Sequence, residues 1–474
     1  MSRRSLAVVG LAVTLVVAAG CRRHRGRASA SESQPTVATD LAEKARKTSR
    51  AFALWRSLTD EVGPRLAGSP GDAKAVEWAL ATMKSLGFAN IRGEKVMVPH
   101  WDRGTARGSL VAPVVQPLQL VALGGSVGTP EGGLEGDVVS VASIEALDAL
   151  PIESVRGKIV FFDKPMNRTK DGSGYGKAVD VRGKGAIAAA RKGALGVLIR
   201  SVGTGAARLP HTGAMRYLDE LPKLPAAALA GPDADLLHRT LERTGAARVS
   251  FTLGCRQLED APSANVVGEV PGSEKPDEIV LIGAHLDSWD LGQGAIDDGA
   301  GVAAVLETGR LLLELPRRPR RTVRVVLFAN EENGLKGAQE YARLHQAELA
   351  KHLLGLEIDL GAGRVFGLQY LAGPGAAAMM KTVAAPLANL GVSPPVEHDG
   401  HGADLWPLRN AGVPVVELQQ DASKYFDLHH TADDTLDKVD SADLDQVTGA
   451  TAAFTWGAAD VVGDLGRIPD AKRK

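Results

Sequence analysis

The feature that most constrains the fold is a series of short apolar runs in the second half of the chain, separated by segments with helical spacing. The apolar runs are DEIVLIGAHL (residues 277–286), TVRVVLFAN (322–330), LLGLEIDL (353–360) and VPVVEL (413–418). Helical patterns lie between them, at residues 299–315, 334–350 and 375–390. Such alternation predicts an α/β fold with a mostly parallel (mixed) central sheet flanked by helices. Ligands bind such sheets beyond the carboxyl ends of the strands.

The first half of the chain has a different pattern. Apolar residues recur at helical spacing over residues 41–58 and 72–86, where Gly87 ends the second segment, and a strand follows near residues 90–98. Short strands and turns then dominate residues 108–254, with GDVVSV, GKIVFFD, ALGVLIRS and LPAAALAG as the strand-like runs and a helix before Ala194. We expect a small β-rich module inserted into the α/β domain.

Length and charge fit this organisation. A chain of 474 residues with 44% hydrophobic side chains is too long for one average domain. Its 55 Lys and Arg residues balance 56 Asp and Glu residues, so no basic face indicates nucleic acid as a partner. The predicted parts are a signal peptide (1–20), a flexible tether (21–40), the α/β domain in two pieces (41–107 and 255–463), the inserted module (108–254) and a tail (464–474).

The amino terminus has the pattern of an export signal. MSRR supplies positive charge, LAVVGLAVTLVVAAG supplies the apolar stretch, and small residues lead to Cys21. Ala19-Gly20-Cys21 resembles a bacterial lipobox, although Ala18 stands where that motif usually has Leu, and an ordinary secretory signal is the alternative. We expect an exported lipoprotein of the bacterial cell envelope, held at the membrane by lipid on Cys21. Cys255 would then have no partner for an intramolecular disulfide, and the tether is not expected to pack.

Carboxylates cluster directly after the first apolar run. The stretch GAHLDSWDLGQGAIDDGAG, residues 283–301, contains one histidine and four aspartates. Unpaired buried charge is costly, so these groups must be solvated, paired or neutralised by a cation. His285 and Asp287 would share one face of a strand, which by itself predicts only a hydrogen-bonded polar pair.

The pattern recurs at the following strands. Glu331 and Glu332 follow VVLFAN, Asp359 lies in LEIDL, and His429 and His430 follow the next strand. Metal-type ligands at or beyond four successive strand ends predict one shared metal site.

The segments GAHLDSWD, GAIDDGAG, NEENGLKGA, EIDLGAG and HHTADDT resemble the co-catalytic two-zinc aminopeptidase family. The resemblance covers nearly everything after the tether and implies a zinc-exopeptidase fold, with two Zn²⁺ ions as cofactors. It implies that His285 and Asp359 bind one zinc, that Glu332 and His430 bind the other, and that Asp297 bridges both. It also implies a cis peptide bond between Asp297 and Asp298. The inserted module resembles the protease-associated domain in its GKIV strand and its GALGVLI strand.

The resemblance further assigns catalytic roles. It makes Glu331 the general base and Asp287 the partner of the His285 imidazole. Many relatives have a tyrosine where this chain has His429, and we assign His429 to oxyanion stabilisation, with a structural hydrogen-bonding histidine as the alternative. For Asp298 we favour a role in capping the helix that follows. Trp289, Asp290 and Asp404 match positions near the site without an assigned role, and His401 is a further candidate for substrate contact.

The predicted function is that of a secreted or lipid-anchored dinuclear zinc exopeptidase. It would hydrolyse short peptides or dipeptides through metal-bound hydroxide, with Glu331 as the base. The alternatives are a non-catalytic binding protein on the same fold and a single-zinc glutaminyl cyclase, and the complete set of expected ligands favours the peptidase. Dimers are common among similar proteins, so a homodimer is an expected assembly.

Overall fold

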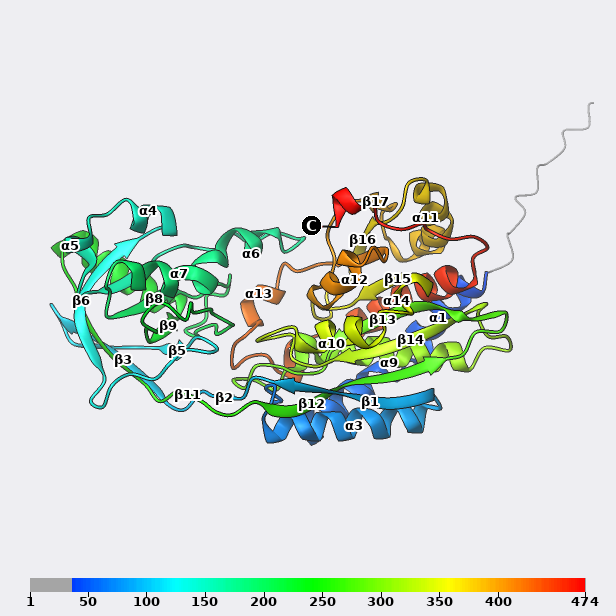
Figure 1. The fold of residues 1–474 in the computed structure, drawn as a ribbon, viewed down its shortest axis with the longest axis horizontal. Coiled ribbons are helices and arrows are strands. Elements are labelled where there is room, and N and C mark those ends of the chain that lie inside the picture. Colours follow the sequence, from blue (N-terminus) through cyan, green and yellow to red (C-terminus); the bar gives the residue numbers. More distant parts are fainter. Residues whose placement is uncertain (1–35, 474) are drawn as a thin grey trace, which may run out of the picture. The chain divides into compact units, whose positions relative to one another are not determined.

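The computed structural model describes residues 36–473, which contain two eight-stranded sheets and a two-stranded ribbon (Figure 1). The first sheet has the strand order β1-β12-β14-β13-β15-β18-β16-β17. Its strands are β1 (Ala89–Val98), β12 (Ala261–Val270), β13 (Lys275–His285), β14 (Arg321–Phe328), β15 (His352–Glu357), β16 (Val365–Leu371), β17 (Val396–Glu397) and β18 (Val415–Gln420).

The centre of the first sheet is parallel. Strand β13 pairs in parallel with β14 and β15, and β15 pairs in parallel with β18. The pairs β1–β12, β12–β14 and β16–β18 are antiparallel. The prediction of a mostly parallel, mixed sheet is therefore confirmed, and the carboxyl ends of four neighbouring strands meet at one edge.

Helices cover both faces of this sheet, which explains why its central strands carry long apolar runs instead of alternating apolar and polar residues. On β13, Val280 and Ile282 belong to one core, and Ile279 and Leu281 belong to the other. The first core includes residues of α1 (Val37–Thr48), α2 (Ala51–Ser57), α3 (Pro70–Leu86), α9 (Ala300–Leu313), α11 (Ala376–Ala384) and α14 (Ser441–Asp460). The second core includes residues of α10 (Lys336–Leu344) and α12 (Trp406–Asn410). Strands buried on both faces cannot alternate apolar and polar residues.

Several expected boundaries are wrong. The helix expected over residues 41–58 is two helices, and the first begins at Val37, inside the segment expected to be an unpacked tether. The Thr36 side chain accepts a hydrogen bond from Thr39 N at 3.3 Å, and Ala38 is buried against the core, so the start of the helix is both capped and packed. The helix expected over 334–350 ends at Leu344. The helix expected over 375–390 gives way to a 3₁₀ turn at Ala385–Leu390, which contains a proline.

The second sheet lies in the region expected to be an insertion, 108–254, except that its strand β3 begins two residues earlier, at Ala106. Its order is β4-β3-β10-β6-β7-β8-β9-β5. The strands are β3 (Ala106–Ala112), β4 (Gln116–Leu118), β5 (Leu120–Ala122), β6 (Leu134–Val141), β7 (Ile159–Phe162), β8 (Gly196–Arg200), β9 (Ala226–Leu229) and β10 (Arg248–Leu253). Its helices are α4 (Ile144–Asp148), α5 (Ile152–Val155), α6 (Ser173–Ala178), α7 (Asp180–Arg191) and α8 (Gly231–Thr244). The ribbon of β2 (Trp101–Asp102) and β11 (Arg256–Gln257) joins the chain segments that enter and leave this sheet.

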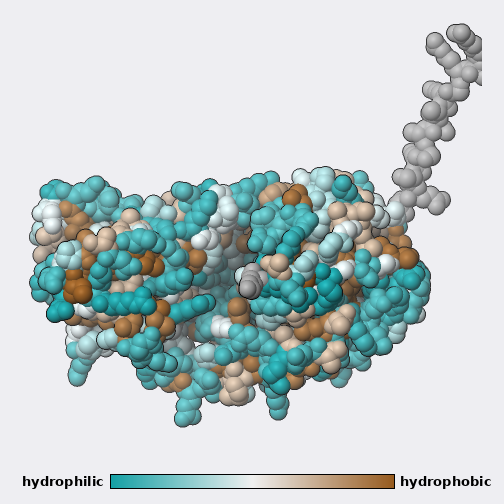
Figure 2. Space-filling view, turned by 45° about the horizontal axis from the view of Figure 1, so that its top comes forward, coloured by the Kyte–Doolittle hydropathy of each residue, from teal (hydrophilic) through white to brown (hydrophobic). Residues whose placement is uncertain are grey.

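The expected signal peptide, Cys21 and most of the expected tether lie outside the described residues. Within residues 36–473, no helix has the length and apolar character needed to cross a membrane. The surface in Figure 2 is mostly hydrophilic, with small scattered hydrophobic areas. Cys255 is buried, and burial raises the pKa of its thiol to about 11, so it is an unreactive thiol at neutral pH.

Candidate metal centre

The ends of the central strands bring together the side chains singled out in the sequence. His285 is the last residue of β13, the Glu331–Glu332 pair follows β14, and Asp359 follows β15. Asp297 lies in a short turn, Ala295–Gly299 (η2), that leads into α9. His429 and His430 follow α13 (Tyr425–Leu428), the helix after β18.

Two histidines approach opposite oxygens of one carboxylate. His285 Nε2 lies 3.1 Å from Asp297 Oδ1 and 3.3 Å from Asp359 Oδ1. His430 Nε2 lies 3.3 Å from Asp297 Oδ2 and 3.0 Å from Glu332 Oε2. Asp297 is therefore central to the cluster, as expected for a carboxylate shared between two cations.

The other ring nitrogen of each histidine contacts a backbone carbonyl. His285 Nδ1 lies 3.0 Å from the carbonyl of Asp287, and His430 Nδ1 lies 3.2 Å from the carbonyl of Thr212. A carbonyl only accepts, so the His285 Nδ1 carries its proton. At His430 the Thr212 carbonyl lies nearer to Nδ1 than Arg182 Nη1 does, at 3.2 Å against 3.4 Å, which favours the same tautomer, and each Nε2 faces carboxylates. This arrangement fixes a ring that binds a metal through Nε2.

A positive charge, either a proton or a metal cation, is needed between these Nε2 atoms and the carboxylates that face them. Burial lowers the pKa of His285, but Asp359 and Asp297 outweigh it and hold that pKa well above its usual range. Burial also opposes protonation of His430, while Glu332 and Asp297 raise its pKa to about 9. The protein groups alone therefore favour a proton at each Nε2, and a metal cation would take the place of that proton.

Asp287 acts through different atoms than the sequence predicts. Its carboxylate is 3.9 Å from His285 Nδ1, and its backbone carbonyl is the nearer group. The carboxylate instead accepts hydrogen bonds from the backbone N–H groups of Glu331, at 2.9 Å, and Glu332, at 3.3 Å. The reason is that β13 ends at His285, so the alternation of a strand no longer aims residue 287 at the ring. Asp287 thus fixes the backbone of the two glutamates.

The two glutamates turn in different directions. Asn330, just before them, has a left-handed φ of 62°, a conformation that non-glycine residues adopt rarely and Asn more readily than most. Glu332 is buried against His430, and its second oxygen, Oε1, has no hydrogen-bond partner among the described residues. Glu331 is partly exposed, and burial, reinforced by Asp359 and Glu332, raises its pKa well above its usual range.

Comparisons with known proteins place the chain in a family. The profile of peptidase family M28 matches residues 265–455. Mouse carboxypeptidase Q is 36% identical over 422 residues, 89% of this chain and 88% of that protein. The crystal structure of a peptidase M28 precursor from Shewanella amazonensis SB2B superposes with a TM-score of 0.90 at 45% identity, covering 91% of this chain and 98% of that one.

This chain belongs to peptidase family M28. Because M28 is a metallopeptidase family, the chain is a metallopeptidase. The family resemblance seen in the sequence is therefore confirmed. A zinc aminopeptidase from Bacillus subtilis shares the fold, with a TM-score of 0.63 at 19% identity over 88% of this chain and 98% of that one.

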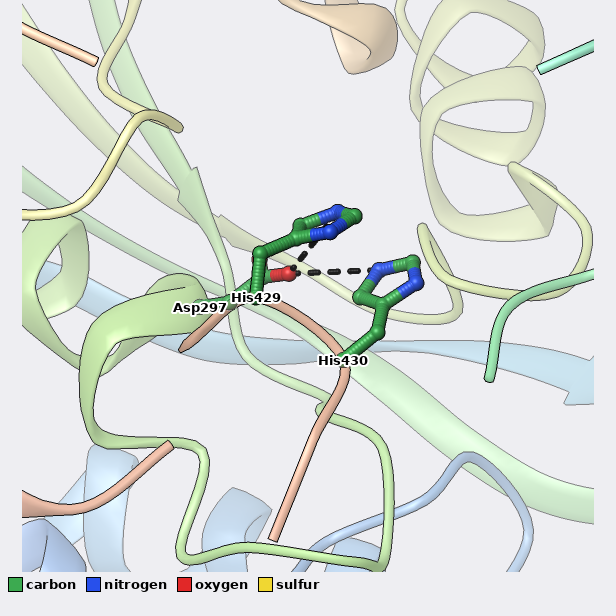
Figure 3. Close-up of side chains that lie close together, drawn as sticks. All are labelled: Asp297, His429 and His430. Atoms are coloured by element: carbon green, nitrogen blue, oxygen red, sulfur yellow. Dashed lines mark ion pairs between the residues drawn. The ribbon is translucent and has the colours of Figure 1, made fainter. Parts of the chain in front are cut away.

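In this M28 peptidase, His429 lies against the predicted metal ligands. Its ring stacks on that of His430, with centroids 3.4 Å apart, and its Nε2 is 3.6 Å from Asp297 Oδ2 (Figure 3). Burial lowers the pKa of His429 well below its usual range, so the ring is neutral at pH 7. Its Nδ1 is buried without a hydrogen-bond partner among the described residues. The geometry thus allows His429 to bind metal or to donate to substrate, and its assignment to oxyanion stabilisation stays a prediction.

The second sheet supplies contacts that the sequence did not predict. Thr212, in the loop between β8 and β9, donates its backbone N–H to the carbonyl of His430 at 3.0 Å. Its neighbour His211 places Nδ1 2.7 Å from the carbonyl of His429. Arg182 of α7 brings Nη1 to 3.4 Å from His430 Nδ1 and donates through Nη2 to the Tyr175 hydroxyl. No local sequence signal marks these residues, because the histidines that they contact lie more than 200 positions away along the chain.

Further residues hold Asp297 in place. The Asp434 carboxylate accepts hydrogen bonds from the backbone N–H groups of Ile296, at 2.5 Å, and Asp297, at 3.4 Å. Asp434 belongs to the HHTADDT segment, so a signal was present without an assigned role. The Asp297–Asp298 peptide bond is cis, as expected. Asp298 accepts from Gly301 N at 3.1 Å, which confirms its role as a cap of α9.

Two further candidates pack around the site. Trp289 is buried between Trp101 and His430, with ring centroids 6.4 Å and 5.7 Å away. Asp290 accepts a hydrogen bond from Arg103 Nε at 2.8 Å. These contacts indicate structural roles.

Proposed function

We propose that this M28 peptidase is a two-zinc exopeptidase that removes residues from short peptides or splits dipeptides, with Glu331 as the general base. The observation that carries the proposal is the geometry around Asp297. Each of its oxygens faces the Nε2 of a different histidine, and the Nδ1 of each histidine is tied to a backbone carbonyl. That is the arrangement expected when two cations share one carboxylate.

The donor set suits zinc. Zinc binds imidazole nitrogen and carboxylate oxygen, and these are the groups that converge here. His285 and Asp359 would hold one ion, Glu332 and His430 the other, and Asp297 both. The unpartnered Oε1 of Glu332 is a buried carboxylate oxygen that a cation would satisfy. When bound, zinc would lower the pKa of a water molecule and polarise the peptide carbonyl.

The protein groups would move the proton. Glu331 sits at the edge of the cluster, next to the proposed ligand Glu332, where its carboxylate would accept a proton from water and pass it to the leaving amine. Asp287 keeps the Glu331 backbone in place through the hydrogen bond from Glu331 N. His429 would donate an N–H to the oxygen of the tetrahedral intermediate.

A panel of free and N-blocked peptides, two to six residues long, tests this function. We expect cleavage by the zinc-loaded enzyme, loss of cleavage after treatment with a chelator, and recovery on adding zinc. Metal analysis of the active protein should give two ions per chain. One ion per chain would favour the glutaminyl cyclase alternative, and two ions without any cleavage would favour a binding protein.

We also propose that the protein is exported and anchored by lipid on Cys21. The support is the basic start, the apolar stretch and Ala19-Gly20-Cys21. Partitioning of the native protein into detergent should be lost in Cys21→Ser. Detergent partitioning that persists in that variant would contradict the lipid anchor.

We further propose that residues 108–254 form a protease-associated domain. It would be inserted between the two pieces of the peptidase domain, 41–107 and 255–463. The β-rich second sheet and the helix before β8 support this assignment.

A further inference from the structure

Two glutamates lie side by side on neighbouring strands next to the candidate metal centre. Glu357, the last residue of β15, is the register partner of Glu417 on the parallel strand β18. Neighbouring strands are about 4.8 Å apart, and paired residues project to the same face. Two ionised carboxylates in such a pair repel each other, and either a proton or a nearby cation relieves the repulsion.

Within residues 36–473, no lysine or arginine lines the space beside these two glutamates, and the groups whose positive charge would act on them are His285 for Glu357 and His398 for Glu417. Glu357 is 3% exposed, and its Oε2 accepts a hydrogen bond from Asp404 N at 3.1 Å. Its Oε1 has no partner, and both carboxylate oxygens of the fully buried Asp404 also lack one, counted over residues 36–473. Buried carboxylate oxygens without donors are costly.

A cavity of about 170 Å³ lies beside Glu357 and Glu417, and Asp404 is not among its lining residues. The polar side chains that line it are Glu357, Asp359, His401, Glu417 and Gln420, and no lysine or arginine of the described chain is among the lining residues. His401 Nδ1 lies 2.7 Å from the Gly402 carbonyl, to which it donates, so that N–H is not available to the glutamates. Because Asp359 also belongs to the candidate metal centre, the cavity adjoins the place where a substrate would bind.

A glycine-containing loop closes over the carboxylates. A Cβ at Gly402 would lie 2.0 Å from Glu357 Oε2, and a Cβ at Gly400 would lie 2.5 Å from Glu417 Oε2. The backbone therefore approaches both carboxylates more closely than any other residue type would allow. A cavity of this size is below the roughly 300–1000 Å³ of pockets for drug-sized ligands, and fits one small group.

We propose that this cavity, the acidic subsite, binds a primary ammonium group of the peptide substrate, with Glu357 and Glu417 as its acceptors. The ammonium is that of the α-amino terminus or of a lysine side chain. A metal ion is less suited to the cavity: within residues 36–473, neither group of three metal-type side chains whose ligand atoms lie within 4.8 Å of one another includes Glu357 or Glu417. An ammonium group donates three hydrogen bonds, and its acceptors can lie farther apart than the ligands of a metal ion. The proposal rests on the peptidase function for its choice of ligand.

Kinetics of Glu417→Gln test the acidic subsite, because glutamine keeps the shape and removes the charge. Two ratios of kcat/KM are measured. The first compares Lys-Leu with norleucyl-leucine, which lacks the side-chain ammonium. The second compares norleucyl-leucine with hexanoyl-leucine, which lacks the α-amine. We expect one of the two ratios of kcat/KM to fall at least about tenfold, as loss of a charge-assisted hydrogen bond would cause. A fall in the first ratio assigns the subsite to lysine side chains, and a fall in the second assigns it to the terminus. Unchanged ratios would overturn the proposal.

Glu397→Gln is the matched control, since Glu397 is exposed on β17 and pairs with Lys472 outside the cavity. Both ratios should stay at their wild-type values in that variant. Thermal melting of both variants would show whether the fold persists.

A binding experiment decides the proposal even if no peptide is cleaved. Ligand-observed NMR with the full chain should detect n-pentylammonium but not 1-pentanol, and Glu417→Gln should abolish the difference. Equal signals from the two probes in the wild-type protein would contradict the acidic subsite while leaving the peptidase function open. Selective ammonium binding together with no cleavage would instead contradict the peptidase function.

Discussion

At the scale of single residues, the Glu331–Glu332 pair shows how neighbours in sequence reach different surroundings. The left-handed Asn330 turns the chain after β14, and Asp287 holds the backbone N–H groups of both glutamates. Glu332 then meets His430, while Glu331 stays at the edge of the cluster. A change of carboxylate to amide at each position therefore separates proton transfer from metal binding.

We predict that Glu331→Gln lowers kcat by about 10²–10⁴, the usual contribution of a general acid–base group, with zinc content and melting temperature near wild type. Glu332→Gln should lose zinc as well as activity, because it replaces a carboxylate within 3.0 Å of His430 Nε2. Steady-state kinetics and metal analysis of the two variants check this. Metal loss in Glu331→Gln with retention in Glu332→Gln would reverse the assignment of the pair.

Sequence patterns predicted the residues of the cluster better than the atoms that act. The strand-end pattern predicted that His285, the Glu331–Glu332 pair, Asp359 and the His429–His430 pair would meet, because strand ends in a parallel sheet share one edge. Asp297, and the choice of Glu332 and His430 as ligands, came from the family resemblance, and the structure brings these residues together. The pattern fails for the Asp287 side chain, since the exact end of β13 decides which way that residue points.

At the scale of elements, the central strands and the helices between them were readable because both faces of the sheet are buried, whereas α8 and the long α14 were not predicted. Strand β12 was missed, although it lies between β1 and β14, because its sequence APSANVVGEV mixes polar residues and glycine into the apolar run. The loop between β8 and β9 was also missed as part of the site. Its contacts to His429 and His430 depend on the fold as a whole and leave no periodic signal.

The contacts of the loop between β8 and β9 lead to a testable prediction about zinc binding. His211 is buried and holds the His429 carbonyl, while Thr212 pairs with His430, whose φ of 64° is unusual for a non-glycine residue. His211→Leu removes the donor to a buried carbonyl and loosens this turn. We expect zinc affinity to fall about 10–100-fold, as for other changes behind a metal ligand. Competition with a chelator, followed by metal analysis, measures it.

The control is His238→Leu, because His238 is an exposed histidine on α8 of the same region. It should leave zinc affinity unchanged. Equal retention of zinc by wild type and His211→Leu would show that the loop does not support the metal centre.

At the scale of the whole molecule, acid stability depends on histidines that are buried uncharged. His352, at the start of β15, is 2% exposed. Its Nδ1 lies 3.0 Å from the Glu348 carbonyl, so Nδ1 carries the proton, and Nε2 accepts from the Tyr341 hydroxyl at 2.9 Å. Burial lowers the pKa of His352 to about 4, and the nearby Arg324 and His345 act in the same direction.

In the unfolded chain the pKa of a histidine returns to about 6.5. Between pH 6.5 and pH 4 the unfolded state therefore binds a proton that the folded state refuses, so stability falls as the pH is lowered through this range and His352 has no further effect below it. The loss amounts to about 3 kcal/mol at its limit.

Glutamine at this position can contact the same two groups without titrating, so His352→Gln should show a smaller loss of unfolding free energy between pH 7 and pH 4 in urea titrations. His398→Gln, at an exposed histidine, should follow the wild type, and identical pH dependence in all three proteins would mean that His352 does not set acid stability.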